Sequence, residues 1–319
     1  MEEVCCNVCN NNETELIFFE KDKFGISQDR FNIVRCKNCG LIYINPRPTL
    51  EEIVKFYPDT YSWKETIRAG SFFTKFIRNL EKLYRYHLLN YEVRKVLQNT
   101  GLESGKILDV GCGTGDRLRV FKEKGFDTYG IEISSSARYA KDALKLNVFE
   151  GDLFKAHFPD DFFDIVTMYN VLEHLHNPAE MLGEASRILK KEGFLVIQVP
   201  NMDSLQFKLF KDRWAAIDAP RHLYYFNQDK IKEFLQKRGF KITKIDHFNN
   251  WWHPPTIVIT LFPSLDPQMS WLAEKEKKGT VLKRLCWIFW TVVLPVFTFF
   301  ESMIKKGAII TVYAEKQNG

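Results

Sequence analysis

The stretch Lys106-Ile-Leu-Asp-Val-Gly-Cys-Gly-Thr-Gly-Asp-Arg117 decides the fold class of this chain. Ile107, Leu108 and Val110 give its first part the apolar character of a short buried strand. Three glycines follow at alternating positions, and glycine lets a turn adopt positive φ angles and lets a ligand approach the backbone closely. The stretch therefore predicts a strand, a glycine-rich turn and a helix around a bound cofactor.

The spacing of these glycines narrows the choice of cofactor. Nicotinamide, flavin and adenosylmethionine sites all combine a strand, a glycine-rich turn and a helix, so a glycine triplet alone does not decide. A dinucleotide site has the pattern Gly-x-Gly-x-x-Gly, whereas this loop reads Gly-x-Gly-x-Gly with Asp109 just before it. The loop thus departs from the dinucleotide pattern.

The region downstream of Gly105 alternates short Val- and Ile-rich runs with helical stretches. That alternation predicts an α/β fold with a parallel sheet covered by helices. The predicted strands are Lys106–Val110, Thr128–Ile133, Asn147–Glu150, Phe163–Tyr169, Gly193–Val199, Lys241–His247 and Ala308–Ala314. Seven strands in one alternating run predict a single doubly wound sheet.

These features resemble class I S-adenosylmethionine-dependent methyltransferases, from Lys106 to the C-terminus. The resemblance implies a Rossmann-like seven-stranded methyltransferase sheet and a cofactor whose methionine portion lies against the glycine loop. The loop residues that it assigns to the cofactor are Asp109, Gly111, Cys112, Gly113 and Gly115.

Further polar residues follow the next predicted strands. Glu132 ends the second strand, where a carboxylate accepts hydrogen bonds from both ribose hydroxyls. The resemblance places Asp152 near the adenine amino group, Leu153 against the ring and Asn170 at the methionine end. Two other interpretations stay open: Asp152 as an ordinary turn residue, and Glu173–His174 as a helix start.

The N-terminal region contains two Cys-x-x-Cys pairs with 26 residues between them, Cys6/Cys9 and Cys36/Cys39. Four thiolates at this spacing suit one structural zinc ion in a zinc-ribbon-like module. Cys5 is a competing first ligand, but its gap to Cys9 is atypical, so we predict Cys6. The alternative is a group of free cysteines in a small core.

Composition shifts divide the chain into three parts. We predict a zinc-binding module at 1–48, a helical connector or lid at 49–104 and a methyltransferase domain at 105–319. The strand–helix rhythm breaks at about 251–306, which predicts an insertion before the last strand.

The run Asp218–Phe226 suggests a catalytic residue. Together with the four-cysteine module it resembles the sugar-modifying methyltransferases, and the resemblance implies that His222 is the general base. A structural histidine is the alternative. Arg221 stands where the sugar C-methyltransferases often have Glu, which leaves both O- and C-methylation open. Its side chain would bind an acceptor phosphate, cap a helix or pair with Asp218.

Charge and hydropathy bear on partners and location. The 45 basic residues exceed the 40 acidic ones only slightly and form no block, which argues against nucleic acid as a partner. The start lacks the features of a signal peptide and predicts a cytoplasmic protein.

The apolar stretch 285–300 is short for a membrane span and has basic flanks. It predicts either an interfacial helix at the inner face of the membrane or a buried helix or dimer surface.

We therefore expect methyl transfer to a sugar-containing or lipid-linked small molecule, as in polysaccharide biosynthesis. A rival is O-methylation of a quinone or hydroxylated aromatic, which leaves the zinc module unexplained. A rival of another class is a zinc-ribbon interaction protein that binds the cofactor without turnover. The oligomeric state is not indicated.

Overall fold

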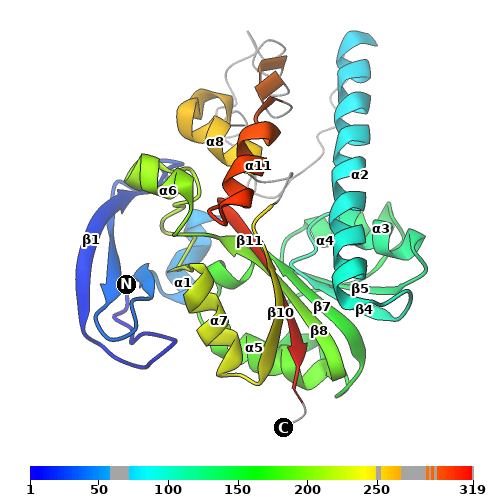
Figure 1. The fold of residues 1–319 in the computed structure, drawn as a ribbon, viewed down its shortest axis with the longest axis horizontal. Helices are drawn as coiled ribbons and strands as arrows, with labels where there is room; N and C mark the ends of the chain where they lie inside the picture. Colours follow the sequence, from blue (N-terminus) through cyan, green and yellow to red (C-terminus); the bar gives the residue numbers. More distant parts are fainter. Residues whose placement is uncertain (58–71, 249–252, 267–284, 287–288, 291–292, 318–319) are drawn as a thin grey trace. The chain divides into compact units, whose positions relative to one another are not determined.

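The computed structural model describes residues 1–57, 72–248, 253–266, 285–286, 289–290 and 293–317 (Figure 1). The chain divides into two compact units. We name them the cysteine unit, which comprises Met1–Tyr61, Asn170–Gly183 and Ile197–Val312, and the loop unit, which comprises Ser62–Tyr169, Glu184–Val196 and Tyr313–Gly319.

A seven-stranded sheet with the order β10-β11-β8-β7-β4-β5-β6 confirms the predicted fold class. Its strands are β4 (Lys106–Val110), β5 (Asp127–Glu132), β6 (Asn147–Glu150), β7 (Phe163–Tyr169), β8 (Leu189–Pro200), β10 (Phe240–Asp246) and β11 (Ile309–Lys316). β4 pairs in parallel with β5 and β7, and β5 with β6. β8 begins at Leu189 rather than at the predicted Gly193, because its polar start is tied to β7 by the 2.8 Å ion pair of Lys190 with Asp164.

Helices occupy most of the connections between strands. The α-helices are α1 (Leu50–Ile53), α2 (Phe72–Thr100), α3 (Asp116–Glu123), α4 (Ser136–Asp142), α5 (Pro178–Ile188), α6 (Leu205–Phe210), α7 (Gln228–Gln236), α8 (His253–Leu261) and α11 (Pro295–Met303). The 3₁₀ helices are η1 (Val54–Phe56), η2 (Phe154–Ala156), η3 (Leu172–His174), η4 (Lys211–Arg213) and η5 (Pro263–Leu265).

The core of the loop unit joins the connector helix α2 to the sheet. Leu89, Val93 and Val96 of α2 are buried in one cluster with Ile107 of β4 and Phe121 of α3. Each such side chain stabilises the fold by about 1.5–3 kcal/mol. The C-terminal half of α2 is therefore an integral part of the unit that carries the glycine loop.

A second, four-stranded sheet lies in the cysteine unit and has the order β1-β2-β3-β9. Its strands are β1 (Thr14–Lys21), β2 (Arg30–Cys36), β3 (Ile42–Ile44) and β9 (Tyr224–Tyr225). β9 pairs with β3 through Ile42↔Tyr225 and Tyr43↔Tyr224, and the rings of Tyr43 and Tyr224 stack at 6.3 Å. A two-residue strand has no periodicity to recognise, so the sequence did not predict this pairing.

The region between β10 and β11 is described in part. α8, η5 and α11 lie there, and α11 begins with Pro295 in its first turn, where a proline fits a helix. Residues 287–288 and 291–292 of the predicted apolar stretch lie outside the described residues. Among the described helices, none combines the length and hydropathy needed to span a membrane.

Candidate functional site

The glycine loop of the loop unit has an open side and a packed side. Gly113 has a φ of 55°, and a Cβ added there would have no atom within 4 Å. Gly115 has a φ of 78°, and a Cβ there would lie 2.6 Å from Leu146 Cδ1. Gly115 thus lets α3 pack closely, while Gly113 leaves room for a ligand to approach the backbone.

Glu132 connects this loop to the end of β5. Its Oε2 accepts a 2.8 Å hydrogen bond from the backbone N–H of Gly113, and its Oε1 accepts a 2.7 Å bond from that of Ser134. The structure therefore brings Glu132 and the glycine loop together. The carboxylate is held in place by backbone donors, as a site for hydroxyl groups requires.

Asp109 fixes the loop from its buried side. Thr167 Oγ1 donates a 2.6 Å hydrogen bond to Asp109 Oδ1, and Arg117 Nη1 lies 3.6 Å from Oδ2. Burial raises the pKa of Asp109, whereas Arg117 acts to lower it. Arg117 also donates a 3.2 Å bond to Glu92 of α2. The sequence assigned no role to Glu92 or Arg117, although Arg117 stands at the end of the stretch Lys106–Arg117.

The other predicted cofactor residues occupy neighbouring positions. Asp152 follows β6, accepts a 2.9 Å hydrogen bond from the backbone N–H of Lys155 and pairs with its ammonium. Leu153 is fully buried, and Cys112 is nearly so. Asn170 belongs to the cysteine unit and has a φ of 53°, which asparagine tolerates.

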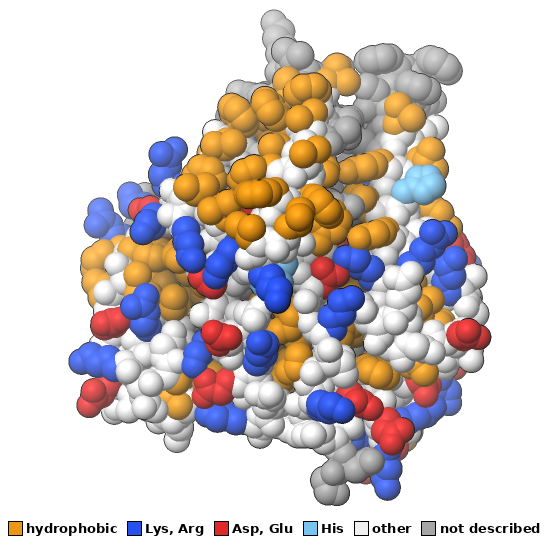
Figure 2. Space-filling view, in the orientation of Figure 1, with side chains coloured by type: hydrophobic (Ala, Val, Ile, Leu, Met, Phe, Trp, Pro, Cys, Tyr) orange, Lys and Arg blue, Asp and Glu red, His pale blue; other side chains and the backbone are white. Residues whose placement is uncertain are grey.

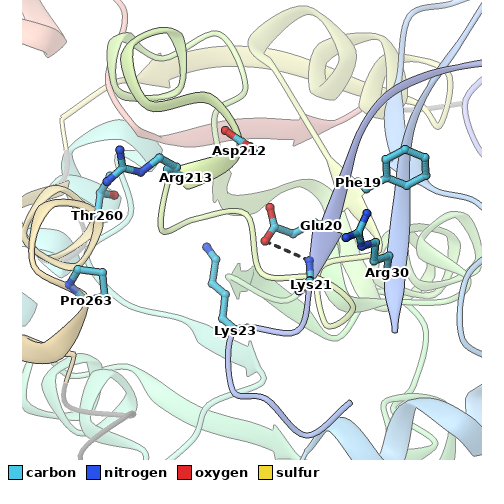
Figure 3. Close-up of a pocket in the computed structure, with 9 residues that line it drawn as sticks. All are labelled: Phe19, Glu20, Lys21, Lys23, Arg30, Asp212, Arg213, Thr260 and Pro263. Atoms are coloured by element: carbon cyan, nitrogen blue, oxygen red, sulfur yellow. Dashed lines mark hydrogen bonds between the residues drawn. The ribbon is translucent and has the colours of Figure 1, made fainter. Parts of the chain in front are cut away.

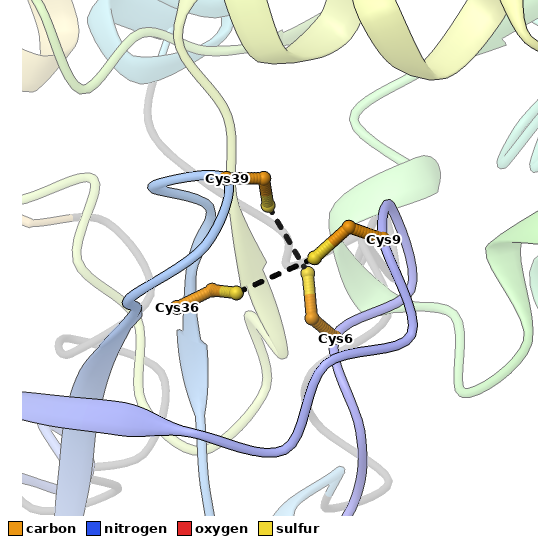
Figure 4. A group of neighbouring side chains, drawn as sticks. All are labelled: Cys6, Cys9, Cys36 and Cys39. Carbon is orange, nitrogen blue, oxygen red and sulfur yellow. Dashed lines mark hydrogen bonds between the residues drawn. The ribbon is translucent and has the colours of Figure 1, made fainter.

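The four predicted zinc ligands lie together in the cysteine unit. The sulfurs of Cys6, Cys9, Cys36 and Cys39 are all within 4.8 Å of one another (Figure 4). Two of the sulfur pairs are separated by 3.4 and 3.5 Å. Zn–S bonds of about 2.3 Å in a tetrahedron place sulfurs about 3.8 Å apart, so this donor set fits zinc. Cys5 is exposed and outside the group.

His222 lies just before β9, with one ring nitrogen engaged. Its Nδ1 is 2.9 Å from the carbonyl oxygen of Ala216, and a carbonyl only accepts, so Nδ1 carries the proton and Nε2 the lone pair. The ring of His174 lies 4.6 Å away, edge to face. His174 Nδ1 is in turn 3.0 Å from the carbonyl of Arg221 and 3.0 Å from the hydroxyl of Tyr57.

Burial controls protonation in this cluster. It lowers the pKa of His222 to about 3, and the neighbouring His174 adds to the effect while Asp218 opposes it. Burial also lowers the pKa of His174 and raises that of Glu173 to about 8. Both histidines are thus neutral at physiological pH. Sequence reasoning did not link Tyr57 and His174 to His222, because the three come from distant segments.

The Arg221 side chain is engaged in a buried network of ion pairs. Its Nε donates to both oxygens of Asp218 at 3.1 and 3.0 Å, and its Nη1 donates to Asp22 at 2.8 Å. The guanidinium is fully buried and also lies 4.1 Å from the ring of Phe24. Of the three interpretations of Arg221, the structure shows the pairing with Asp218.

A cavity of about 450 Å³ opens in the cysteine unit (Figure 3). Its charged lining residues are Lys21, Lys23, Arg30, Arg213, Glu20 and Asp212. Four cations therefore face two carboxylates. Lys23 donates to the carbonyl oxygens of Trp214 and Ala215, and burial lowers its pKa to about 8. Lys23 also acts electrostatically on Asp218 and His222, so the cavity and the histidine cluster share one charge network.

Comparison with known proteins gives the family. The methyltransferase domain family matches residues 82–245 of the 319. A ubiquinone/menaquinone biosynthesis C-methyltransferase of Roseobacter denitrificans is 28% identical over 46% of this chain and 66% of its own length. A ubiquinone biosynthesis O-methyltransferase of Glaesserella parasuis is 31% identical over 39% of this chain and 58% of its own length. The chain thus spans less than two thirds of either relative.

A solved structure supports the fold. Phosphoethanolamine N-methyltransferase 2 of Haemonchus contortus, in complex with phosphomonomethylethanolamine and S-adenosylhomocysteine, superposes with a TM-score of 0.50 at 18% identity. The match covers 72% of this chain and 53% of that chain. With the family match over more than half of its length, this chain belongs to the methyltransferase domain family and is an S-adenosylmethionine-dependent methyltransferase.

Proposed function

We propose that this enzyme methylates a sugar-containing or lipid-linked small molecule, with His222 as the general base. The observation that carries the proposal is the Nε2 lone pair of His222, which the hydrogen bond to Ala216 leaves unprotonated. A cation-lined cavity of ligand size lies in the same unit, and its Lys23 acts electrostatically on His222. Imidazole and cations together suit an acceptor that must lose a proton and carries negative charge.

The cofactor roles follow from the loop unit. Glu132 would accept the ribose hydroxyl hydrogens, and Gly111 and the open backbone at Gly113 would face the methionine portion. Asp152 and Leu153 would hold the adenine ring. Asn170 follows the last residue of β7 and would hold the methionine end, since ligands of parallel sheets bind beyond the carboxyl ends of the strands.

The reaction requires alignment and one proton transfer. The sulfonium of the cofactor supplies an electrophilic methyl group, so the protein mainly orients the acceptor for in-line attack. His222 would take the proton from the attacking oxygen or carbon. The neutral imidazole is the form that a base requires, and Asp218, which acts to raise the pKa of His222, would stabilise the imidazolium that forms.

The charges of the cavity favour a phosphate-bearing acceptor. Lys21, Lys23, Arg30 and Arg213 outnumber Glu20 and Asp212, as expected for the diphosphate of a nucleotide sugar or a lipid-linked sugar. A quinone or hydroxylated aromatic is the second candidate, supported by the names of the two relatives. A neutral aromatic would leave these cations without a role.

Two accessory roles complete the proposal. The four cysteines would hold a structural zinc ion, because a closed thiolate set leaves no open coordination position.

The cytoplasmic enzyme would also touch the inner face of the membrane through α8 and α11. Figure 2 shows apolar side chains gathered over these helices, and Val296, Phe299, Phe300 and Met303 of α11 are more than half exposed. Lys305 and Lys306 follow α11 and would contact anionic headgroups.

The test is transfer of a radiolabelled methyl group from S-adenosylmethionine to a nucleotide sugar, a lipid-linked sugar and a catechol. We expect transfer to a phosphorylated sugar, reduced about 10²- to 10⁴-fold in His222→Ala. His247→Ala is the matched control, because His247 is buried in the same unit and bonded to Gln228. Turnover with the catechol alone would favour the second candidate, and binding without turnover on any acceptor would favour a non-catalytic protein.

A further inference from the structure

The side chains around His222 include a carboxylate that the proposed methyl transfer does not use. Glu173 lies in η3, has no exposed surface, and neither of its carboxylate oxygens has a hydrogen-bond partner among the described residues. A buried, unpaired carboxylate is costly, so such a group normally binds a proton or a cation. One oxygen of Glu173 and one ring nitrogen each of His174 and His222 lie within 4.8 Å of one another.

Both histidines are held in the tautomer that a metal requires. His222 Nδ1 donates to the carbonyl oxygen of Ala216 at 2.9 Å, and His174 Nδ1 donates to that of Arg221 at 3.0 Å. A metal-bound histidine characteristically donates its other ring N–H to a carbonyl or carboxylate, which fixes the ring and directs the lone pair to the ion. Here both Nε2 lone pairs remain available.

We propose that Glu173, His174 and His222 form a second metal site that binds a divalent ion such as Zn²⁺. Two imidazoles and one carboxylate are a common donor set for zinc, with water in the fourth position. Ligand atoms around tetrahedral zinc lie about 3.3 Å apart, so small side-chain rotations would close the present spacing. The partial exposure of His174 provides access for the ion.

This site predicts a form of regulation that rests on the proposed function. The lone pair of His222 Nε2 accepts either the acceptor's proton or the metal ion, but not both. Zn²⁺ bound to Glu173, His174 and His222 therefore inhibits methyl transfer, and its removal restores activity. The four-cysteine site is separate, because it uses none of these ligands.

The test is titration of the metal-free full chain with Co²⁺, followed by absorption spectroscopy. We expect two equivalents. The first gives thiolate-to-cobalt charge-transfer bands from the cysteine site, and the second gives visible bands without charge transfer, as nitrogen and oxygen ligands do. Glu173→Gln, which preserves shape and hydrogen-bonding capacity, weakens the second equivalent by more than about 100-fold, since the loss of an outer partner alone costs 10- to 100-fold.

Two controls keep the result interpretable. The charge-transfer bands must persist in Glu173→Gln, which shows that the cysteine unit is folded. Glu180→Gln, an exposed glutamate in the same unit, must retain both equivalents. A single equivalent in the unaltered chain, or a second equivalent unchanged in Glu173→Gln, overturns the proposal. Because the titration needs no acceptor, it decides the metal site even if the proposed methyl transfer fails.

Discussion

Two buried charged side chains, Glu132 in the loop unit and Arg221 in the cysteine unit, are satisfied in different ways. In the loop unit, Glu132 accepts hydrogen bonds from the backbone of nearby residues, Gly113 and Ser134. In the cysteine unit, Arg221 is held by Asp218 and by the distant Asp22. Losing a carboxylate in the first case leaves the backbone fold in place, whereas losing one in the second leaves an uncompensated buried charge. We therefore expect loss of Glu132 to reduce ligand affinity and loss of Arg221 to reduce stability.

The largest stability effect is expected at the cysteine site. Cys36→Ser removes one thiolate, and structural zinc contributes about 10–16 kcal/mol in small zinc-binding peptides. We expect the variant to lose one equivalent of zinc by elemental analysis and to unfold at a much lower temperature by calorimetry. Cys5→Ser should change neither quantity, because Cys5 is exposed and outside the cluster. Retention of zinc in Cys36→Ser would contradict the assignment.

The second effect concerns the buried charge network. Arg221→Met leaves Asp22 and Asp218 without their cation and should reduce the free energy of unfolding by about 3–5 kcal/mol. Arg213→Met, at an exposed arginine in the same unit, should stay within about 0.5 kcal/mol of the unaltered protein. Denaturant titration measures both. Equal reductions in the free energy of unfolding for Arg221→Met and Arg213→Met would contradict a stabilising role of this buried network.

The third effect tests the loop unit. Glu132→Ala should weaken S-adenosylhomocysteine binding by about 100-fold, because two hydrogen bonds to a charged group are lost. Its unfolding temperature should change far less than that of Arg221→Met. Asp127→Asn, at the opposite end of β5, is the matched control and should bind normally. Calorimetric titration gives the affinities, and a Glu132→Ala variant that binds normally would remove this carboxylate from the cofactor site.

The smallest effect depends on pH. Burial raises the pKa of Glu301 in the cysteine unit to about 7, although Gln206 donates a 3.0 Å hydrogen bond to it. The folded protein thus holds this proton more tightly than the unfolded chain, so its contribution to stability is complete below about pH 4.5 and is lost as the pH rises through 7. Glu301→Gln should add about 2 kcal/mol at pH 8 and little at pH 4.5. Equal gains at both pH values would exclude titration as the cause.

The two units also differed in how well the sequence predicted them. The glycine loop, the strands around it and the Cys-x-x-Cys pairs are local patterns, because each combines residues a few positions apart. All seven predicted strands are present in one sheet, although the sheet is mixed rather than wholly parallel. Strand ends differ from the prediction by at most two residues, except that β8 begins four residues earlier, at Leu189.

The surroundings of His222 could not be predicted in the same way. Tyr57, His174 and His222 are brought together by tertiary contacts, and no spacing along the chain encodes them. Arg221 could be assigned to Asp218 only once its burial was known. A side-chain cluster assembled from three distant segments can be recognised only in the folded chain.

The pairing of β3 with β9 has a consequence for how the protein is made and altered. Tyr43 leaves the ribosome about 180 residues before its partner Tyr224, which at about 5–20 residues per second is roughly 10 to 40 s. During that interval the edge of β3 has no strand to complete it, and unpaired edges promote aggregation. In a chimera that transplants only the first 48 residues onto another methyltransferase, β3 would never gain β9 as its partner. A workable graft must therefore also carry the segment from Asp218 to Phe226.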